Sequence, residues 1–150
     1  MRVMFVCHGN ICRSPMAEYV MKHLVRQKGL EGEIIVSSSA TSREEIGNDV
    51  HRGTKDVLWR NSIACPRRSA VQITRKDYEN SDYIVVMDRN NIRNLKRIIG
   101  EDDGNKVYML RDFSDGGGDV ADPWYTGDFE TTFEMVYEGC KGLLERIEKE

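Results

Sequence analysis

Long apolar segments are missing from this sequence of 150 residues. No run approaches the ~20 apolar residues that a helix needs to cross a bilayer. The apolar stretch from Val3 to Val6 is too short for the core of a signal peptide, and no cleavage pattern follows it. We therefore expect no membrane partner and a cytoplasmic location, with export by a signal-independent route left open.

An excess of positive charge is missing as well. Lysine and arginine number 22 against 25 aspartate and glutamate residues, so the net charge is -3. Proteins that follow nucleic acid present a basic face, so we expect no nucleic-acid partner. The length suits one domain, which we place over residues 1–150 because no linker, repeat or low-complexity tract divides the chain. We expect this domain to be a monomer.

Metal and nucleotide motifs are missing too. The four cysteines, Cys7, Cys12, Cys65 and Cys140, include no Cys-x-x-Cys pair, and no paired histidines accompany them, so we expect no zinc site. A chain of this size does not need disulfides, so we expect reduced thiols. The G-x-x-x-x-G-K-[ST] motif of nucleotide-binding loops does not occur.

Short apolar runs alternate with segments of helical periodicity. Strands are predicted over residues 2–6, 33–36, 83–87 and 106–110. Helices are predicted from Pro15 to Gly29 with Ser14 as N-cap, over 51–60, over 74–80 after a Thr74 cap, between an Asp88 cap and Gly100, and from Gly127 onward. This alternation indicates an α/β protein with a parallel sheet covered on both faces. Ligands of such sheets bind beyond the carboxyl ends of the strands.

The segment from Cys7 to Pro15 joins the first predicted strand to the first predicted helix. Backbone N–H groups and a helix N-terminus make an anion cradle at such a junction. Gly9 allows a tight turn, and Asn10 tolerates a left-handed backbone. We therefore predict a phosphate-binding loop made of Cys7, His8, Gly9, Asn10, Ile11, Cys12, Arg13 and Ser14.

Cys7 and Arg13 carry the predicted chemistry. A helix N-terminus and a nearby cation favour the thiolate form of Cys7, which is the nucleophilic form. The planar fork of Arg13 matches two phosphate oxygens, and the Ser14 hydroxyl can donate a hydrogen bond to the sulfur. An activated nucleophile facing a bound tetrahedral anion indicates a covalent phosphocysteine intermediate.

A general acid for the leaving oxygen is predicted at Asp122. Pro123 restrains Asp122 to extended conformations, which helps to fix the acid on its loop. An Asp-Pro pair alone is a common turn. Trp124 and Tyr125 follow directly, and two large aromatic side chains could form the wall of a pocket for an aromatic leaving group.

These motifs resemble the low-molecular-weight protein tyrosine phosphatase family over nearly the whole chain. The family's Cys-x5-Arg-Ser-Pro signature corresponds to Cys7–Pro15, and its Asp-Pro-aromatic-aromatic signature corresponds to Asp122–Tyr125. The resemblance implies a flavodoxin-like, three-layer fold with a four-stranded parallel sheet of order 2-1-3-4, and no cofactor or metal. It implies hydrolysis of a phosphotyrosine-containing protein or a small aryl phosphate.

The same resemblance implies residue roles. Cys7 would attack phosphorus, Arg13 would hold the equatorial oxygens, and Asp122 would protonate the leaving phenol and then activate water. Asn10, Ser14 and Ser38 would form a network that shapes the loop. Ile11 would line the pocket and favour phosphotyrosine, since relatives that resemble phosphoarginine phosphatases tend to have threonine there. The pocket wall would comprise Ile11, Glu44, Trp124 and Tyr125.

The sequence departs from the family pattern at several positions. Glu44 stands where an aromatic residue is frequent, which favours basic residues beside the phosphotyrosine. Arg68 and Val71 replace a histidine and an arginine that are common near the loop-shaping network, which weakens the prediction of its outer part.

In this family the cysteine that corresponds to Cys12 can capture an oxidised nucleophile as a disulfide. We therefore predict a reversible bond between Cys7 and Cys12 under peroxide.

Three rival functions stay open. An arsenate reductase on a similar scaffold would need further cysteines a short distance apart, whereas Cys65 and Cys140 are isolated in the sequence. A non-catalytic phosphotyrosine-binding module would need neither a nucleophile nor an acid. A phosphocarrier with a phosphorylated cysteine would not need Arg13.

Overall fold

Four parallel strands form the central sheet in the order β2-β1-β3-β4. The computed structural model describes all 150 residues. The strands are β1 (Arg2–Cys7), β2 (Ile35–Ala40), β3 (Tyr83–Val86) and β4 (Val107–Met109). The predicted α/β fold and the strand order 2-1-3-4 are confirmed.

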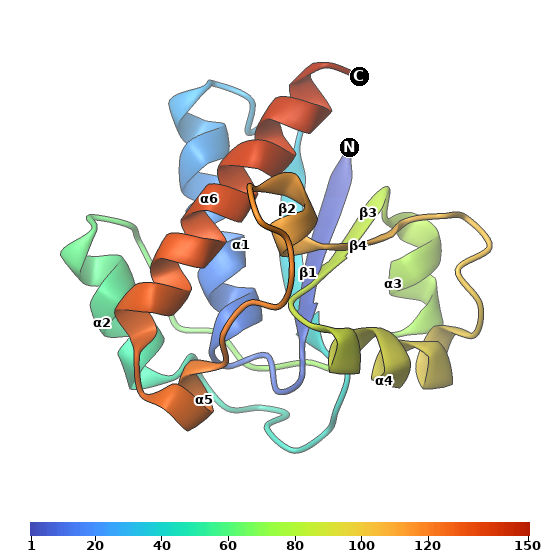
Figure 1. Cartoon of the computed structure of the whole chain (residues 1–150), viewed down its shortest axis with the longest axis horizontal. Helices are drawn as coiled ribbons and strands as arrows, with labels where there is room; N and C mark the ends of the chain where they lie inside the picture. The colour runs from blue at the N-terminus through green and yellow to red at the C-terminus, as the bar shows by residue number, and fades with distance from the viewer.

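Helices cover both faces of the sheet (Figure 1). The long helices α1 (Arg13–Gln27) and α6 (Phe129–Glu148) pack against each other on one face, with α2 (Arg52–Arg60) beside them. The other face is covered by α3 (Arg75–Asn80) and α4 (Arg89–Ile99). Two short elements follow β4, namely the 3₁₀ helix η1 (Leu110–Phe113) and the single turn α5 (Pro123–Thr126). None of the helices is both long and apolar enough to span a bilayer.

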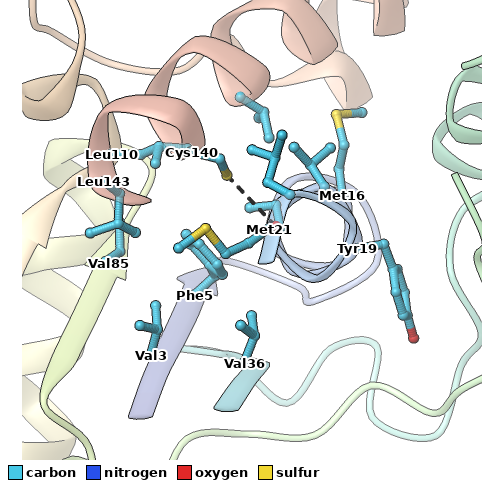
Figure 2. Packing of buried hydrophobic residues seen from close by; sticks show 14 of the residues in the cluster. Val3, Phe5, Met16, Tyr19, Met21, Val36, Val85, Leu110, Cys140 and Leu143 are labelled. Atoms are coloured by element: carbon cyan, nitrogen blue, oxygen red, sulfur yellow. Dashed lines mark hydrogen bonds between the residues drawn. The ribbon is translucent and has the colours of Figure 1, made fainter. Parts of the chain in front are cut away.

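Alternate residues of β1 supply the two cores. Val3 and Phe5 point toward α1 and α6, while Val6 belongs to the smaller cluster under α4. Figure 2 shows the larger core, where Cys140 of α6 faces α1 and its thiol lies 3.7 Å from the carbonyl oxygen of Ala17. Because β1 is buried from both sides, it holds the loop that follows it on a rigid base.

The second strand lies later in the chain than its predicted range, 33–36. It runs from Ile35 to Ala40, because Ser37–Ala40 pair in register with Met4–Cys7 of β1. The predicted range ended before the serines, but they belong to the strand, and Ser38 and Ser39 are buried. The side chain of Ser38 donates a hydrogen bond to Glu18, so its hydroxyl is satisfied inside the protein.

The first helix begins earlier than predicted. Cys12 is its N-cap, and the bond from Met16 N to Cys12 O closes the first turn. Ser14 is therefore not the N-cap; it lies inside the first turn, where its backbone N–H has no helical partner. Pro15 is tolerated there because the first turn needs no N–H from it.

The predicted caps of the two helices beside β3 are confirmed. Thr74 and Asp88 each accept a hydrogen bond from the third helical residue, and both form reciprocal capping boxes. The strands β3 and β4 are each shorter than predicted at their ends. The elements η1 and α5 were not predicted, because single turns of four residues leave too little periodicity to recognise.

Candidate active site

A pocket of about 280 Å³ opens at the carboxyl end of β1. Cys7 is the last residue of this strand, and the loop that follows leads directly into α1. In Figure 1 the turn α5 lies at this same end of the molecule. The structure thus brings together both predicted motifs, and the pocket is lined by Cys7, His8, Gly9, Ile11, Cys12, Arg13, Glu44, Glu45, Asp122, Trp124 and Tyr125.

The sulfur of Cys7 is surrounded by hydrogen-bonding groups. The backbone N–H groups of Asn10 and Ser14 each point at it from 3.4 Å. The Ser14 hydroxyl lies 3.1 Å from the sulfur. Two N–H donors, one at the start of α1, supply positive partial charge where a thiolate would carry its negative charge. The buried sulfur therefore has two N–H groups and a hydroxyl directed at it.

Asn10 holds the loop in shape. Its backbone has a φ of 60°, a left-handed conformation that an asparagine tolerates better than most residues. Its side-chain amide donates to Ser14 Oγ at 2.8 Å and to Ser38 Oγ at 3.0 Å. The carbonyl oxygen of this amide accepts from Val71 N at 3.2 Å. The predicted contacts among Asn10, Ser14 and Ser38 are present.

Arg68 completes this network. The family pattern did not predict this role for Arg68. Its Nη2 donates to Asn10 Oδ1 at 2.8 Å and to the carbonyl of Ser38 at 3.3 Å. Its Nη1 contacts Ser38 Oγ and forms an ion pair with the buried Glu18. Glu18 also binds Lys22 at 2.6 Å. Arg68 therefore supplies the outer part of the loop-shaping network, for which the family pattern gave no firm prediction.

Arg13 is fixed by two carboxylates and a carbonyl. Its Nη1 donates to Asp88 Oδ2 at 2.8 Å and to the carbonyl of Val120 at 3.0 Å, and its Nη2 lies 3.3 Å from Asp122 Oδ2. Arg13 is only 3% exposed. Burial opposes its charge, but the negative charges of Cys7, Asp122 and Asp88 outweigh burial and raise the pKa of Arg13.

Asp88 was predicted only as a helix cap, and the structure gives it two contacts. One carboxylate oxygen caps α4 by accepting from Asn91 N at 2.8 Å. The other oxygen pairs with Arg13. No sequence signal links positions 13 and 88, since the contact depends on the pairing of β1 with β3.

Asp122 is the N-cap of the turn α5. Its backbone is extended, as the following proline requires, and its Oδ1 accepts from Trp124 N at 3.1 Å. Trp124 is 59% exposed and Tyr125 is 85% exposed. Trp124 contacts the ring of His51 edge-on rather than packing into the core. Both aromatic side chains line the pocket.

The loop between β2 and α2 also lines the pocket. Glu44 lines the pocket as predicted, and its carboxylate contacts the imidazole of His8. Glu45 lines the pocket too and was not singled out in the sequence; its side chain packs against the backbone of Gly9. Asn48 donates to the Glu45 carboxylate at 3.2 Å.

Cys12 lies at the pocket with Cys7. Burial, followed by the charge of Cys7, raises the pKa of Cys12 to about 12. Cys12 therefore stays protonated at neutral pH, whereas the two backbone N–H groups point at the sulfur of Cys7. Cys140 is fully buried in the core, as predicted, and Cys65 packs against the same core from a half-buried position.

The chain is similar in sequence and in structure to known phosphatases. YfkJ of Bacillus subtilis, a low molecular weight protein-tyrosine-phosphatase, is 41% identical over 150 residues, which is 99% of this chain and 96% of the relative. The crystal structure of YfkJ superimposes with a TM-score of 0.95 at 40% identity, over 99% of this chain and 95% of that one. PtpA of Staphylococcus epidermidis is 39% identical over 99% of this chain and 94% of its own length. Residues 2–150 match the sequence model of the family described as low molecular weight phosphotyrosine protein phosphatase. The chain therefore belongs to this family, and it is an enzyme of the protein-tyrosine-phosphatase class.

Proposed function

We propose that the protein hydrolyses phosphotyrosine in proteins, and small aryl phosphates, through a phosphocysteine intermediate on Cys7. The observation that carries the proposal is the convergence of three groups on one pocket. The pocket is lined by the sulfur of Cys7, at which two backbone N–H groups point. It is also lined by the buried guanidinium of Arg13 and by the carboxylate of Asp122, which precedes a proline. A nucleophile, an anion clamp and a proton donor are the parts that phosphate ester hydrolysis needs.

In the first step the Cys7 thiolate attacks phosphorus while the bond to the phenol oxygen breaks. Arg13 binds two non-bridging oxygens, and the N–H groups of the loop bind the remaining charge. Asp122 gives its proton to the departing oxygen. The Asp122 carboxyl contacts Arg13, so the proposed acid lies beside the group that binds the phosphate.

In the second step Asp122, now ionised, removes a proton from water. The hydroxide so formed attacks phosphorus, the sulfur–phosphorus bond breaks, and inorganic phosphate leaves. The Ser14 hydroxyl, 3.1 Å from the sulfur, stabilises the returning thiolate. Every step uses side chains of this chain, so the proposed reaction requires no metal and no cofactor.

The pocket walls fit an aromatic leaving group. Ile11 contributes an apolar side chain from within the phosphate-binding loop, and Trp124 and Tyr125 line the same pocket. A planar phenyl ring can pack between such walls. The side chain of Ile11 cannot form a hydrogen bond with the guanidinium of a phosphoarginine. The pocket therefore supports phosphotyrosine over phosphoarginine as the substrate.

The rival functions find less support. An arsenate reductase would need a further thiol that can carry a disulfide from the pocket toward the surface. The Cys140 thiol cannot do so, because it is fully buried against Ala17. A binding module or a phosphocarrier would not need a carboxylate held next to the guanidinium of Arg13.

The test is hydrolysis of p-nitrophenyl phosphate and of a phosphotyrosine peptide, in the presence of a chelator. We expect wild type to turn over both, Cys7→Ser to be inactive, and Asp122→Ala to be slowed by roughly 10²–10⁴-fold. Rapid quenching of Asp122→Ala with labelled substrate should trap phosphate on Cys7. A folded, reduced wild type that hydrolyses neither ester would overturn the proposal.

A further inference from the structure

Two carboxylates stand at one rim of the pocket. Glu44 is exposed and Glu45 is half-buried, and both come from the loop between β2 and α2. Both line the pocket, and neither belongs to the phosphate-binding loop of residues 7–14. They therefore add negative charge to the pocket wall outside the phosphate-binding loop.

No lysine or arginine at the rim balances this charge. Among the residues that line the pocket, Arg13 is the single one of these types, and it lies at the floor in contact with Asp88 and Asp122. Arg43 precedes Glu44 in the sequence, but its Nε donates to Gln72 at 3.1 Å. His8 contacts one oxygen of Glu44, and the Glu45 carboxylate has no cationic partner.

A second part of the rim is aromatic and exposed. Trp124 and Tyr125 turn their rings to solvent at the mouth of the same pocket. A cation beside the face of such a ring is attracted by the negative face of the π system. An acidic rim and an aromatic rim are independent features, and both suit a positively charged side chain.

We propose that this rim selects phosphotyrosine sites that carry lysine or arginine directly beside the phosphotyrosine, with Glu44 and Glu45 as the specificity-determining residues. The inference rests on the proposed phosphotyrosine phosphatase function and names its preferred substrates. The basic side chain pairs with the two carboxylates while its aliphatic stem lies along Tyr125. Acidic residues at the same positions are repelled.

The experiment compares kcat/KM for three phosphotyrosine peptides of one sequence, in which both residues next to the phosphotyrosine are Lys, Gln or Glu. We expect the Lys peptide to exceed the Gln peptide by about 2- to 20-fold, since each exposed ion pair contributes about 1.4- to 5-fold. The ratio should shrink when salt rises from low concentration to about 0.5 M, because such pairs are screened.

The variant Glu44→Gln/Glu45→Gln is expected to bring the Lys-to-Glu peptide ratio close to one. The matched control is Glu31→Gln/Glu33→Gln, which removes the same charge from two exposed side chains before β2, at the other end of the strands. This control should keep the wild-type ratio. Because the readout is a ratio within one enzyme, a general loss of activity does not affect it.

The two proposals fail differently. If p-nitrophenyl phosphate and all three peptides are left intact, the phosphatase function itself is wrong. If wild type hydrolyses them with equal kcat/KM, or prefers the Glu peptide, the phosphatase function stands and the selectivity for basic sites is overturned. A preference for Lys that survives the double substitution overturns the assignment to Glu44 and Glu45.

Discussion

The guanidinium of Arg68 donates a hydrogen bond of 2.8 Å to the side-chain carbonyl of Asn10. The two residues lie far apart in the sequence, yet this contact helps to hold Asn10 at its positive φ. Asn10 in turn aims its backbone N–H at the sulfur of Cys7. Arg68 therefore acts on the nucleophile through Asn10, as a positioning residue.

Replacing Arg68 should disturb both stability and chemistry. In Arg68→Ala the buried Glu18 loses its arginine partner and Asn10 loses a donor, so we expect the free energy of unfolding to fall by about 1.5–3 kcal/mol. We also expect kcat/KM to fall by about 10- to 100-fold, because the loop would no longer hold its donors in place. Urea unfolding and p-nitrophenyl phosphate kinetics measure the two effects.

A further readout separates positioning from general destabilisation. The rate at which iodoacetamide alkylates Cys7 at neutral pH should fall in Arg68→Ala, since fewer donors would stabilise the thiolate. Arg67→Ala is the matched control, because Arg67 is an exposed neighbour with the same charge. An unchanged alkylation rate in a folded Arg68→Ala protein would reduce Arg68 to a purely structural role.

The two contacts of Asp88 can be separated by substitution. Asp88→Asn keeps a side chain that can cap α4, since asparagine is a good N-cap, but it removes one of the two carboxylates that hold the buried Arg13. We expect unfolding free energy to drop by about 1–3 kcal/mol. Inorganic phosphate should restore more stability to this variant than to wild type, because the anion supplies a new partner for Arg13.

Thermal unfolding with and without phosphate checks this expectation. Asp88→Ala should lose about 1 kcal/mol more than Asp88→Asn, the cost of the missing cap. Asp115→Asn, at an exposed position, controls for the change of charge. If phosphate stabilises wild type and Asp88→Asn equally, the carboxylate of Asp88 is not needed to support Arg13.

The parts of the structure that the sequence predicts are those set by local pattern. The junction from Cys7 to Pro15 combines the end of an apolar run, a glycine and a helix start within a few residues, so its position between β1 and α1 follows from the sequence alone. The caps Thr74 and Asp88 are equally local. Asp122 was identified from its neighbours Pro123, Trp124 and Tyr125.

The parts that the sequence missed depend on pairing in space. The serines of β2 look polar, and only their register with β1 shows that Ser38 is buried under the loop. The sequence showed Arg68 only as a departure from the family pattern. Its partners Asn10 and Glu18 lie in the loop after β1 and in α1, so their contacts with Arg68 appear only in the folded chain. The contact of Asp88 with Arg13 likewise needs the sheet to exist first.

Stability should depend on pH through Asp49. A hydrogen bond from Lys55 is the main cause that lowers the pKa of Asp49 to about 2, and the backbone N–H groups of Arg68 and Val50 add to it. Since the folded pKa lies below the unfolded value of about 3.9, ionised Asp49 stabilises the fold above pH 4. This stabilisation is lost as pH falls from about 4 toward about 2.

We therefore expect Asp49→Asn to lower the melting temperature at pH 7 by about 2–4 °C, the shift that corresponds to roughly 1 kcal/mol in a chain of this length. The difference from wild type should shrink steadily below pH 4. Asp56→Asn, an exposed residue of α2, should show no such dependence. A difference that stays constant from pH 7 to pH 3 would contradict the role of the Asp49 charge.

Peroxide should join Cys7 and Cys12 reversibly. Hydrogen peroxide oxidises the Cys7 thiolate to a sulfenic acid, and the Cys12 sulfur then displaces hydroxide, so that a disulfide and water form. Burial raises the pKa of Cys12, so few Cys12 thiolates exist at neutral pH and we expect the second step to be slow there. The rate of disulfide formation should rise about tenfold per pH unit between pH 7 and 9, where the protonated form of Cys12 dominates.

Intact mass after mild peroxide should show the loss of two hydrogens, and a thiol reductant should restore both the mass and the activity. Cys12→Ser should instead proceed to sulfinic acid on Cys7, gain two oxygens and stay inactive after reduction. Cys65→Ser is the matched control and should behave as wild type, because Cys65 does not line the pocket. Full recovery of Cys12→Ser after peroxide would show that Cys12 does not protect the nucleophile.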